Sequence, residues 1–416
     1  MNQYILLIGC FDTKGEVFAY LRKAILAKSE RVLTINTGVM GTTTDFPVDY
    51  ESDEVARAAS HSLADLRKNR DRGQAIDVMG RGAAALVKQL VDAGKIKAVV
   101  GMGGGGGTFI ALSAMQVVPF GIPKLCLTTL AAKDLSRQVG SKDITLMPSV
   151  VDVAGLNSMI APMIEQAAAA ICAMANVNTT FTNESSGRIA ISMFGNTTAC
   201  VDQCTELLNK QGYEVFAFHA NGVGGKTMEA LILEGCFDAV LDTTTTELAD
   251  ELCGGICSAG PDRLSAAAKL GIPQVVVPGC LDMVNFGHPD TVPARFSHRR
   301  LYSWAPDVTL MRTDAVENKE LGRRLAQKLN QSSEPVTVVL PLNGLSQLDA
   351  EGAIFYEPQV DQVLFDAIKN NVTTHINVIE SPAHINDNAF STLLVNCLVA
   401  MIQEKQATGK ISAINP

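Results

Sequence analysis

The stretch AVVGMGGGGGTFIAL, residues 98–112, decides the fold class of this chain. Five successive glycines, Gly103–Gly107, lie between one apolar run and the next. Inside regular structure each glycine costs roughly 0.5–1 kcal/mol relative to alanine, so the run needs a compensating gain. Close approach of the backbone to a ligand would supply that gain. We therefore expect a strand before the glycines, a helix after them, and a ligand between the two.

The same order of strand, turn and helix recurs in both halves of the chain. Apolar runs that predict strands alternate with helical patterns, at 5–8, 31–36, 97–101 and 122–129 in the first half and at 188–195, 213–220, 237–242 and 273–279 in the second. Such alternation indicates βαβ units and parallel sheets.

The length of 416 residues exceeds what one hydrophobic core usually supports. We predict an α/β protein of two Rossmann-like, doubly wound domains with parallel sheets, over residues 1–180 and 187–416. The polar segment NTTFTNESSG, residues 178–187, follows a helix predicted over 153–177 and is the expected boundary.

Composition and charge limit the classes of partner that we expect this chain to bind. The net charge is −9 and no Lys/Arg stripe stands out, so we expect no nucleic-acid partner. Asn157, Glu165 and Gln166 interrupt the apolar segment 153–177, which predicts a buried helix rather than a membrane span. The N-terminus carries no basic leader of a signal peptide. These features together predict a cytoplasmic protein without a membrane partner.

The ten cysteines are scattered singly, which is typical of a reducing compartment. The pairs Cys200/Cys204 and Cys253/Cys257 have a spacing of four residues, which could present two thiols to a metal ion. No histidine lies near them in the sequence, so we favour a helix face of buried thiols. The identity of any metal ion is left open.

In doubly wound sheets, ligands bind outside the carboxyl ends of the strands. A glycine-rich turn before a helix offers backbone N–H groups to a phosphate, and no side chain blocks the approach. The predicted phosphate-binding residues lie at four such strand ends: Asp12, Thr13, Lys14, Thr37, Gly38, Gly103, Gly104, Gly105, Gly106, Gly107, Thr108, Thr128 and Thr129.

Two other nucleotide motifs compete with this interpretation. The glycine run also satisfies GxGxxG, but the next strand ends in Leu127–Thr129 without the acid that a dinucleotide site uses for the ribose. The segment ANGVGGKT, residues 220–227, misses the P-loop pattern because Ala220 replaces the first glycine. Lys226 is then either solvated at a helix start or reaches a ligand, with Asp242 as an acidic partner.

The segment DTTTTELAD, residues 242–250, follows another predicted strand. Thr244 and Glu247 have the spacing of a capping box, which predicts a well-capped helix. Hydroxyl groups that donate to an anion are the alternative use of these threonines.

Six motifs resemble one known family, in the same order along the whole chain: IGCFDTKG, GMGGGGGT, AGPDRLSAAAKLGIPQVVVPGCLDMVNFG, VTLMRT, LPLNGLSQLDAEG and HINDNAF. They are similar to the family of the plant tobamovirus-resistance protein's N-terminal ATP-binding domain, which has many bacterial members. The resemblance implies two Rossmann-like domains, nucleotide binding and a tendency to dimerise. We expect ATP as the cofactor, with Mg²⁺ as a candidate companion ion, and a homodimer. Where family members commonly have His-Asn-Pro before VTLMRT, this chain has Trp304, Ala305 and Pro306.

A second group of residues could carry chemistry. Asp282 and His288 follow the predicted strand 273–279, and a basic group at 295–300 comes next. An acid, a histidine and arginines suit a small acidic substrate, so Asp282 and His288 are the candidate catalytic residues.

The leading hypothesis is a nucleotide-binding protein that holds ATP in an interdomain cleft, with phosphates on the glycine run and the second domain closing over them. An enzyme that acts on a small organic acid or its phosphate is one alternative. A regulatory binding module shaped by ATP is the other.

Overall fold

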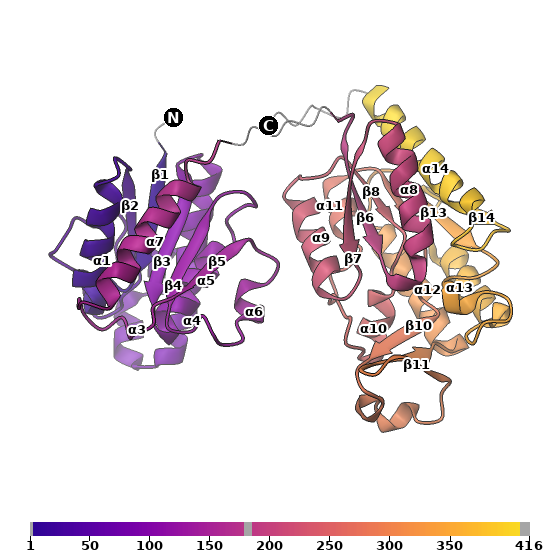
Figure 1. The fold of residues 1–416 in the computed structure, drawn as a ribbon, viewed down its shortest axis with the longest axis horizontal. Helices are drawn as coiled ribbons and strands as arrows, with labels where there is room; N and C mark the ends of the chain where they lie inside the picture. The colour runs from indigo at the N-terminus through magenta and orange to yellow at the C-terminus, as the bar shows by residue number, and fades with distance from the viewer. Residues whose placement is uncertain (1–2, 179–184, 408–416) are drawn as a thin grey trace. The chain divides into compact units, whose positions relative to one another are not determined.

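The chain divides into two compact units, Met1–Thr182 and Asn183–Pro416, in a computed structural model that describes residues 3–178 and 185–407 (Figure 1). Residues 179–184 of the predicted boundary segment lie outside the described residues. Both units are α/β, and each has a parallel sheet between helices. The predicted fold class of two Rossmann-like domains is confirmed.

The first unit contains a five-stranded parallel sheet in the order β2-β1-β3-β4-β5. Its strands are β1 (Tyr4–Gly9), β2 (Val32–Asn36), β3 (Ile96–Gly103), β4 (Lys124–Thr128) and β5 (Ile144–Pro148). Its helices are α1 (Phe11–Leu26), α2 (Ser52–Ala58), α3 (Leu63–Asn69), α4 (Arg72–Asp92), α5 (Gly105–Met115), α6 (Ser136–Val139) and α7 (Ile160–Met174).

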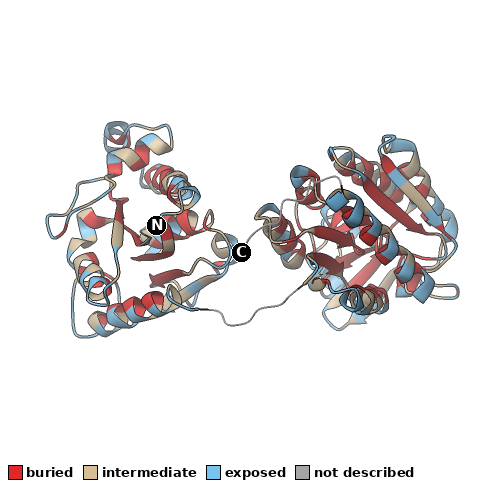
Figure 2. Ribbon diagram, turned by 90° about the horizontal axis from the view of Figure 1, so that it is seen from above, coloured by how far each residue is buried: buried red, intermediate tan, exposed pale blue. Residues whose placement is uncertain are grey.

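Helices cover both faces of this sheet, so the central strands are buried while the helices remain exposed on their outward sides (Figure 2). On one face α1 and α7 pack against the strands, and on the other face α4 and α5 do so. A strand covered on both sides reads as a continuous apolar run, which is why β1 and β3 were visible in the sequence.

Two glycines of the 98–112 stretch serve this packing. A Cβ at Gly101 would lie 2.6 Å from the Cβ of Ala111, and a Cβ at Gly103 would lie 2.9 Å from the Cα of Gly107. Glycine at these positions lets α5 run back closely over β3. Part of the glycine run is therefore explained by the fold alone.

The starts of two helices in the first unit bear on the site. The segment FDTKG forms the first turn of α1, although Lys14 has non-helical φ and ψ angles. The predicted helix over 153–177 begins only at Ile160, because the Asn157 side chain accepts the backbone N–H groups of Met159 and Ile160. Among the described residues, no helix combines the length and apolar character needed to cross a membrane.

The second unit contains a six-stranded parallel sheet in the order β14-β13-β9-β8-β6-β7. These strands are β6 (Arg188–Met193), β7 (Glu214–His219), β8 (Ala239–Asp242), β9 (Gln274–Val276), β13 (Val336–Pro341) and β14 (Ile376–Ser381). Its α-helices are α8 (Thr198–Lys210), α9 (Val223–Leu233), α10 (Glu247–Cys253), α11 (Ala266–Leu270), α12 (Ala315–Leu329), α13 (Pro358–Asn371) and α14 (Asn388–Ala407). Short 3₁₀ turns are η1 (Gly195–Thr197), η2 (Pro289–Thr291), η3 (Ala294–Phe296) and η4 (Gln347–Asp349).

A small antiparallel sheet is inserted between β9 and β13. Its strands are β10 (Met283–Phe286), β11 (Leu301–Ala305) and β12 (Val308–Arg312), in the order β10-β12-β11. The sequence motifs do not predict this sheet. Strand β10 covers residues that follow the predicted strand 273–279 and that we expected to form a loop.

Candidate functional site

A cavity of about 770 Å³ lies at the carboxyl edge of the first sheet. In the strand order β2-β1-β3-β4-β5, the chain runs outward from β1 to β2 and then crosses back past β1 to β3, β4 and β5. The crevice at such a switch point is the usual ligand site of an open α/β sheet. The lining residues come from the segments after β1, β2 and β3, from α3 and α4, and from Asp152: Cys10, Asp12, Thr13, Lys14, Thr37, Gly38, Val39, Met40, Leu66, Arg67, Arg70, Asp71, Arg72, Ala75, Ile76, Met79, Met102, Gly104, Gly105, Gly106, Gly107, Ile110 and Asp152.

The glycine turn, Gly104–Gly107, forms one wall of the cavity. Gly104 is the N-cap of α5 in an extended conformation, and the first N–H groups of a helix have no partner within it. A Cβ at Gly105 would have no heavy atom of the described residues within 4 Å, so the packing of those residues does not require glycine there. Space for a ligand is the remaining physical reason for glycine at this position.

Three of the predicted binding residues lie behind the glycine turn. Thr108 is buried, and its Oγ1 donates to the carbonyl of Gly103 at 3.2 Å and lies 2.6 Å from Oγ1 of Thr128. Gly103 ends β3 within the sheet. Gly103, Thr108 and Thr128 do not line the cavity, and neither does the exposed Thr129, whose N–H donates to the same Gly103 carbonyl at 3.3 Å.

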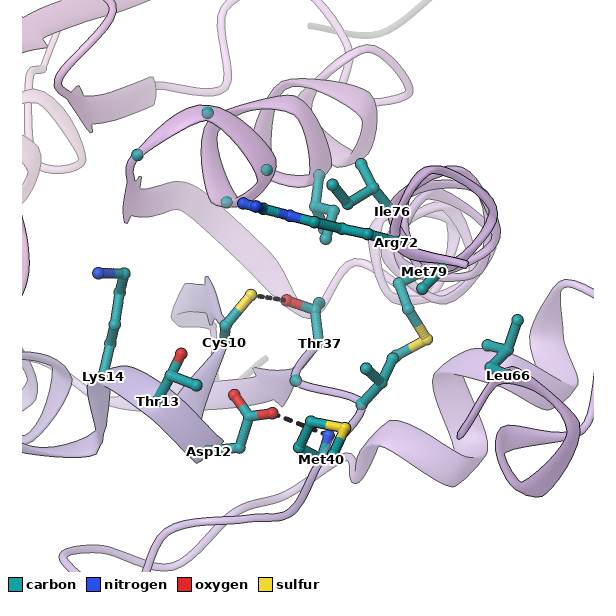
Figure 3. A pocket seen from close by; sticks show the side chains of 18 of the residues that line it. Cys10, Asp12, Thr13, Lys14, Thr37, Met40, Leu66, Arg72, Ile76 and Met79 are labelled. Carbon is teal, nitrogen blue, oxygen red and sulfur yellow. Dashed lines mark hydrogen bonds between the residues drawn. The ribbon is translucent and has the colours of Figure 1, made fainter. Parts of the chain in front are cut away.

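The first turn of α1 forms the floor of the cavity, with Asp12, Thr13 and Lys14 (Figure 3). Asp12 Oδ2 accepts the N–H of Met40 at 2.9 Å, while Asp12 Oδ1 is buried and has no hydrogen-bond partner in the described part of the chain. Gly38 makes this approach possible, because a Cβ there would lie 2.2 Å from Asp12 Cγ. Lys14 Nζ donates to the carbonyl of Val153.

Cys10 is the N-cap of α1, and its Sγ lies 3.5 Å from Oγ1 of Thr37. Burial raises the pKa of this thiol above its ordinary value, so it is protonated at neutral pH. The thiol therefore contributes a neutral polar surface to the cavity and not a thiolate.

Helix α4 supplies the opposite wall. Figure 3 shows the Arg72 side chain extended across the cavity above Cys10 and Thr37. Arg72 and Ile76 lie one turn apart on the same face of α4, and Ile76 packs against the glycine turn, since a Cβ at Gly106 would meet Ile76 Cδ1 at 2.9 Å. The Arg72 guanidinium is thereby placed beside the N-terminus of α5.

None of the sequence motifs indicates the contribution of α3 and α4. The run RKNRDR, residues 67–72, carries four cations and one acid, and it supplies Arg67, Arg70 and Arg72 to the cavity. Leu66, Ile76 and Met79 add apolar surface beside them. A basic run in an acidic chain was the signal that could have identified this wall.

In the second unit, Asp282 and His288 lie at opposite ends of β10 rather than on one loop. Asp282 is fully buried, and its Oδ2 accepts a hydrogen bond from Ser346 Oγ at 2.7 Å. Burial raises its pKa to about 6, and Arg312 opposes that shift. His288 is exposed, with Nδ1 2.7 Å from Oδ1 of Asp290. Within the described residues, no hydrogen bond or ion pair joins Asp282 to His288.

The basic group at 295–300 also forms local contacts. Arg299 binds Glu317, with Nη2 2.7 Å from Oε2, and Arg300 binds Glu357. These contacts fix the loop before β11 to the helices beside it.

The glycine-rich segment 220–227 holds a carboxylate of its own chain. Glu247 Oε1 accepts the N–H groups of Gly222 at 2.8 Å and Gly225 at 3.1 Å. Lys226 is exposed at the start of α9. The predicted capping box is wrong, because α10 begins at Glu247 and its carboxylate reaches this turn instead of the backbone near Thr244.

Cys200 and Cys204 are buried on α8, as the favoured interpretation predicted. Cys253 and Cys257 are not on one helix, because α10 ends at Cys253 and Gly254 takes a left-handed conformation. Over residues 3–178 and 185–407, no group of three or more His, Cys, Asp and Glu side chains is arranged to hold a metal ion.

Fold and cavity together define a protein of two Rossmann-like α/β units with a ligand-sized crevice at the switch point of the first. Comparison with known proteins then gives the family. Residues 3–180 match the Uncharacterised protein family (UPF0261) N-terminal domain, and residues 186–402 match the C-terminal domain of the same family. The chain belongs to the UPF0261 family.

Relatives with similar sequences include a UPF0261 protein of Clostridium tetani, 42% identical over 97% of this chain and 100% of that protein. The ToMV resistance protein Tm-1(GCR237) of Solanum lycopersicum is 39% identical over 78% of this chain and 44% of the tomato protein. The ToMV susceptible protein tm-1(GCR26) of the same plant is 38% identical over 79% of this chain and 45% of that protein. The family resemblance drawn from the motifs is confirmed.

Proposed function

We propose that the first unit binds a nucleotide in the cavity, with its phosphates against the glycine turn. The observation that carries this proposal is Gly105, whose missing side chain leaves space that no atom of the described residues fills. Unpaired N–H groups at a helix N-terminus attract an anion, and the helix dipole adds to that attraction. The resemblance to a plant ATP-binding domain makes ATP the nucleotide to test.

Two cations can share the phosphate charge. The Arg72 guanidinium reaches across the cavity beside the glycine turn, and Lys14 lies on the floor (Figure 3). A guanidinium offers a planar fork of donors that suits phosphate oxygens. The apolar surface of Leu66, Ile76 and Met79 is suited to the base, because ligand sites combine mostly apolar walls with a few polar anchors.

The residues present also fit a magnesium ion that arrives with the nucleotide. Mg²⁺ usually keeps several waters and binds through one or two carboxylates plus substrate phosphates, so it needs no cluster of protein ligands. Asp12 and Asp152 line the cavity, and Oδ1 of Asp12 lacks a partner among the described residues. These two carboxylates would hold the ion, which would neutralise phosphate charge.

Calorimetric titration of the full chain with ATP, with and without Mg²⁺, tests the proposal. We expect Arg72→Ala to weaken ATP binding at least tenfold, about 1.4 kcal/mol. Arg81→Ala is the matched control, because Arg81 lies on the same helix, is exposed, and pairs with Asp77 away from the cavity. We expect this variant to bind within twofold of the parent. An absence of binding to the parent at millimolar ATP would overturn the proposal.

Phosphate release in the same samples separates the two remaining alternatives. Binding without turnover favours a module whose shape depends on ATP. Turnover that requires an added organic acid favours an enzyme. The homodimer, the cytoplasmic location and closure of the second unit over the ligand stay predictions.

A further inference from the structure

The cavity has a second group of cations, away from the glycine turn. The run 67–72 places Arg67 and Arg70 on the cavity wall together with Arg72. All three side chains are exposed, and no ion pair involves them or Lys68 in the described part of the chain. This group of unpaired cations, in a chain of net charge −9, attracts an anionic partner.

A hydrogen bond fixes the position of this group. Arg67 Nε donates to the carbonyl of Val39, which lies three residues beyond the end of β2. The glycine turn follows β3, and β1 lies between β2 and β3. Neighbouring strands are about 4.8 Å apart, so two spacings, about 10 Å, separate the two ends of the cavity. The Arg67 end is thus distinct from the phosphate end.

The cavity extends from the glycine turn toward the end of β2 and not toward β4, since Thr37–Met40 line it while Thr128 and Thr129 do not. A ribose bound beyond the phosphate would therefore lie near the end of β2. An acid there binds a free ribose hydroxyl, whereas an arginine accommodates a ribose phosphate. Here the residue that ends β2 is Asn36, and its side chain is already used. Its Oδ1 accepts the N–H groups of Phe11 and Gly38, and its Nδ2 donates to Gly41 and Glu51.

The nearest cavity carboxylate cannot substitute for that acid. Asp12 Oδ2 accepts the Met40 N–H, and Asp12 Oδ1 is the atom assigned above to the magnesium ion. Asp71 also lines the cavity, but it caps α4, with its Oδ1 accepting the Gln74 N–H at 3.0 Å. The cationic groups at this end are the guanidinium groups of Arg67 and Arg70. Guanidinium groups select phosphate over hydroxyl, because they only donate hydrogen bonds and carry a fixed charge.

We propose that the cavity selects nucleotides that carry an additional phosphate on the ribose, at the 2′ or 3′ position, with Arg67 and Arg70 as its binding residues. The inference rests on the proposed function, because it takes the 5′-phosphate at the glycine turn as the other anchor. Phosphates at both ends of the cavity would neutralise both groups of cations.

Calorimetry with the full chain tests this selectivity with three probes: adenosine 5′-monophosphate, adenosine 2′,5′-bisphosphate and adenosine 3′,5′-bisphosphate. We expect at least one bisphosphate to bind tenfold or more tightly than the monophosphate, and the better one identifies the phosphate position. The double variant Arg67→Ala/Arg70→Ala should lose that gain, measured as the ratio of the bisphosphate affinity to the monophosphate affinity.

Lys68→Ala is the matched control, since Lys68 belongs to the same run and helix but does not line the cavity. It should retain the gain, which separates direct contact from a general loss of positive charge. Bisphosphates that bind within twofold of the monophosphate, or a gain that survives in the double variant, would overturn the inference. If ATP and the monophosphate bind while this gain is absent, the inference alone fails. If none of the nucleotides binds, the proposed function fails with it.

Discussion

The two units share the order of five parallel strands, and they differ at the same place in that order. The switch point of the first sheet lies between β1 and β3, and the equivalent point of the second lies between β6 and β8. In the first unit the segment after the third strand is the glycine turn, Gly104–Gly107, on the wall of a cavity. In the second unit the equivalent segment is Thr243–Thr246, and its side chains are buried.

The polar groups of the second switch point bind one another. Thr244 Oγ1 lies 2.7 Å from Oγ1 of Thr197, and the Thr244 N–H donates to Ser192 Oγ at 2.9 Å. Ser192 Oγ in turn donates to Asp242 Oδ1 at 2.7 Å. In this region the hydroxyl groups that could contact an anion are already satisfied. The fold selects the place for a site, and the side chains decide whether polar groups remain available there.

The largest effect is expected from breaking the charge network behind the second switch point. Arg263 is fully buried and binds Asp242, Glu247 and Glu229. Arg263→Met leaves three carboxylates without their cation, and breaking a buried pair costs about 3–5 kcal/mol. We expect the free energy of unfolding of the second unit to fall by that amount, measured by urea denaturation with the fluorescence of Trp304, the single tryptophan.

Arg324→Met is the control for this experiment. Arg324 pairs with Glu320 on the surface of α12, where an ion pair contributes about 0–1 kcal/mol. Nucleotide affinity should be unchanged in both variants, because the cavity residues belong to the first unit. Equal stability losses in the two variants would show that the buried network does not stabilise the second unit.

The next effect concerns the glycine turn itself. Gly105→Val places a branched side chain where no protein atom is met, so we expect the first unit to stay folded. The same side chain occupies the place proposed for the phosphate, and ATP affinity should fall at least a hundredfold, about 2.8 kcal/mol. Calorimetry measures the affinity, and thermal unfolding checks the fold.

Gly195→Val provides the matched glycine at the carboxyl edge of the second sheet. A Cβ there meets only Trp304 at 3.9 Å, which is an ordinary contact. This variant should leave ATP affinity unchanged. If folded Gly105→Val keeps the ATP affinity of the parent, the glycine turn does not bind the phosphate. The two switch points would then not differ in their capacity to bind a ligand.

Much of this contrast could be predicted from local sequence patterns. The strands around residues 98–112 follow from apolar runs that end in glycine, since buried parallel strands are apolar throughout. The rule that ligands bind at carboxyl ends correctly brought Asp12, Thr37 and Gly104–Gly107 to one cavity. Their role in binding stays a prediction.

The missed parts depend on contacts between distant segments. The cations at 67–72 would be an ordinary solvated helix end without the packing of Ile76 on Gly106, which brings α4 to the glycine turn. Strand β10 depends on pairing with β12, for example Val284 with Met311, and no local pattern reports such a partner. Thr108 and Thr128 were predicted as ligands, but they face each other below the turn because side-chain direction depends on the exact start of α5.

The two units should also differ in their response to pH. In the second unit Asp349, Asp282 and Asp361 surround Arg312, and all four side chains are buried. Burial, together with the charges of Asp282 and Asp361, raises the pKa of Asp349 to about 9. One guanidinium cannot neutralise three carboxylates, so Asp349 keeps its proton in the folded unit at neutral pH. In the first unit, by contrast, the carboxylates of Asp12 and Asp152 line the cavity.

The smallest effect follows from that proton. An unfolded aspartate has a pKa of about 3.9, so between that value and about 9 the folded unit binds one proton more than the unfolded chain. Stability must then fall as pH rises, by about 1.4 kcal/mol per pH unit for one proton. Asp349→Asn keeps the shape and removes the titration. Between pH 7 and 8, urea unfolding followed by Trp304 should show a slope that is smaller by about that amount in the variant.

Asp366→Asn, an exposed acid on α13, is the control and should keep the parent slope. Parallel slopes for the parent and Asp349→Asn would mean that Asp349 is already ionised in the folded unit. The second unit would then tolerate a buried charge without a counter-ion. Its interior would not depend on neutral, paired polar groups, which are the feature that distinguishes it from the first unit.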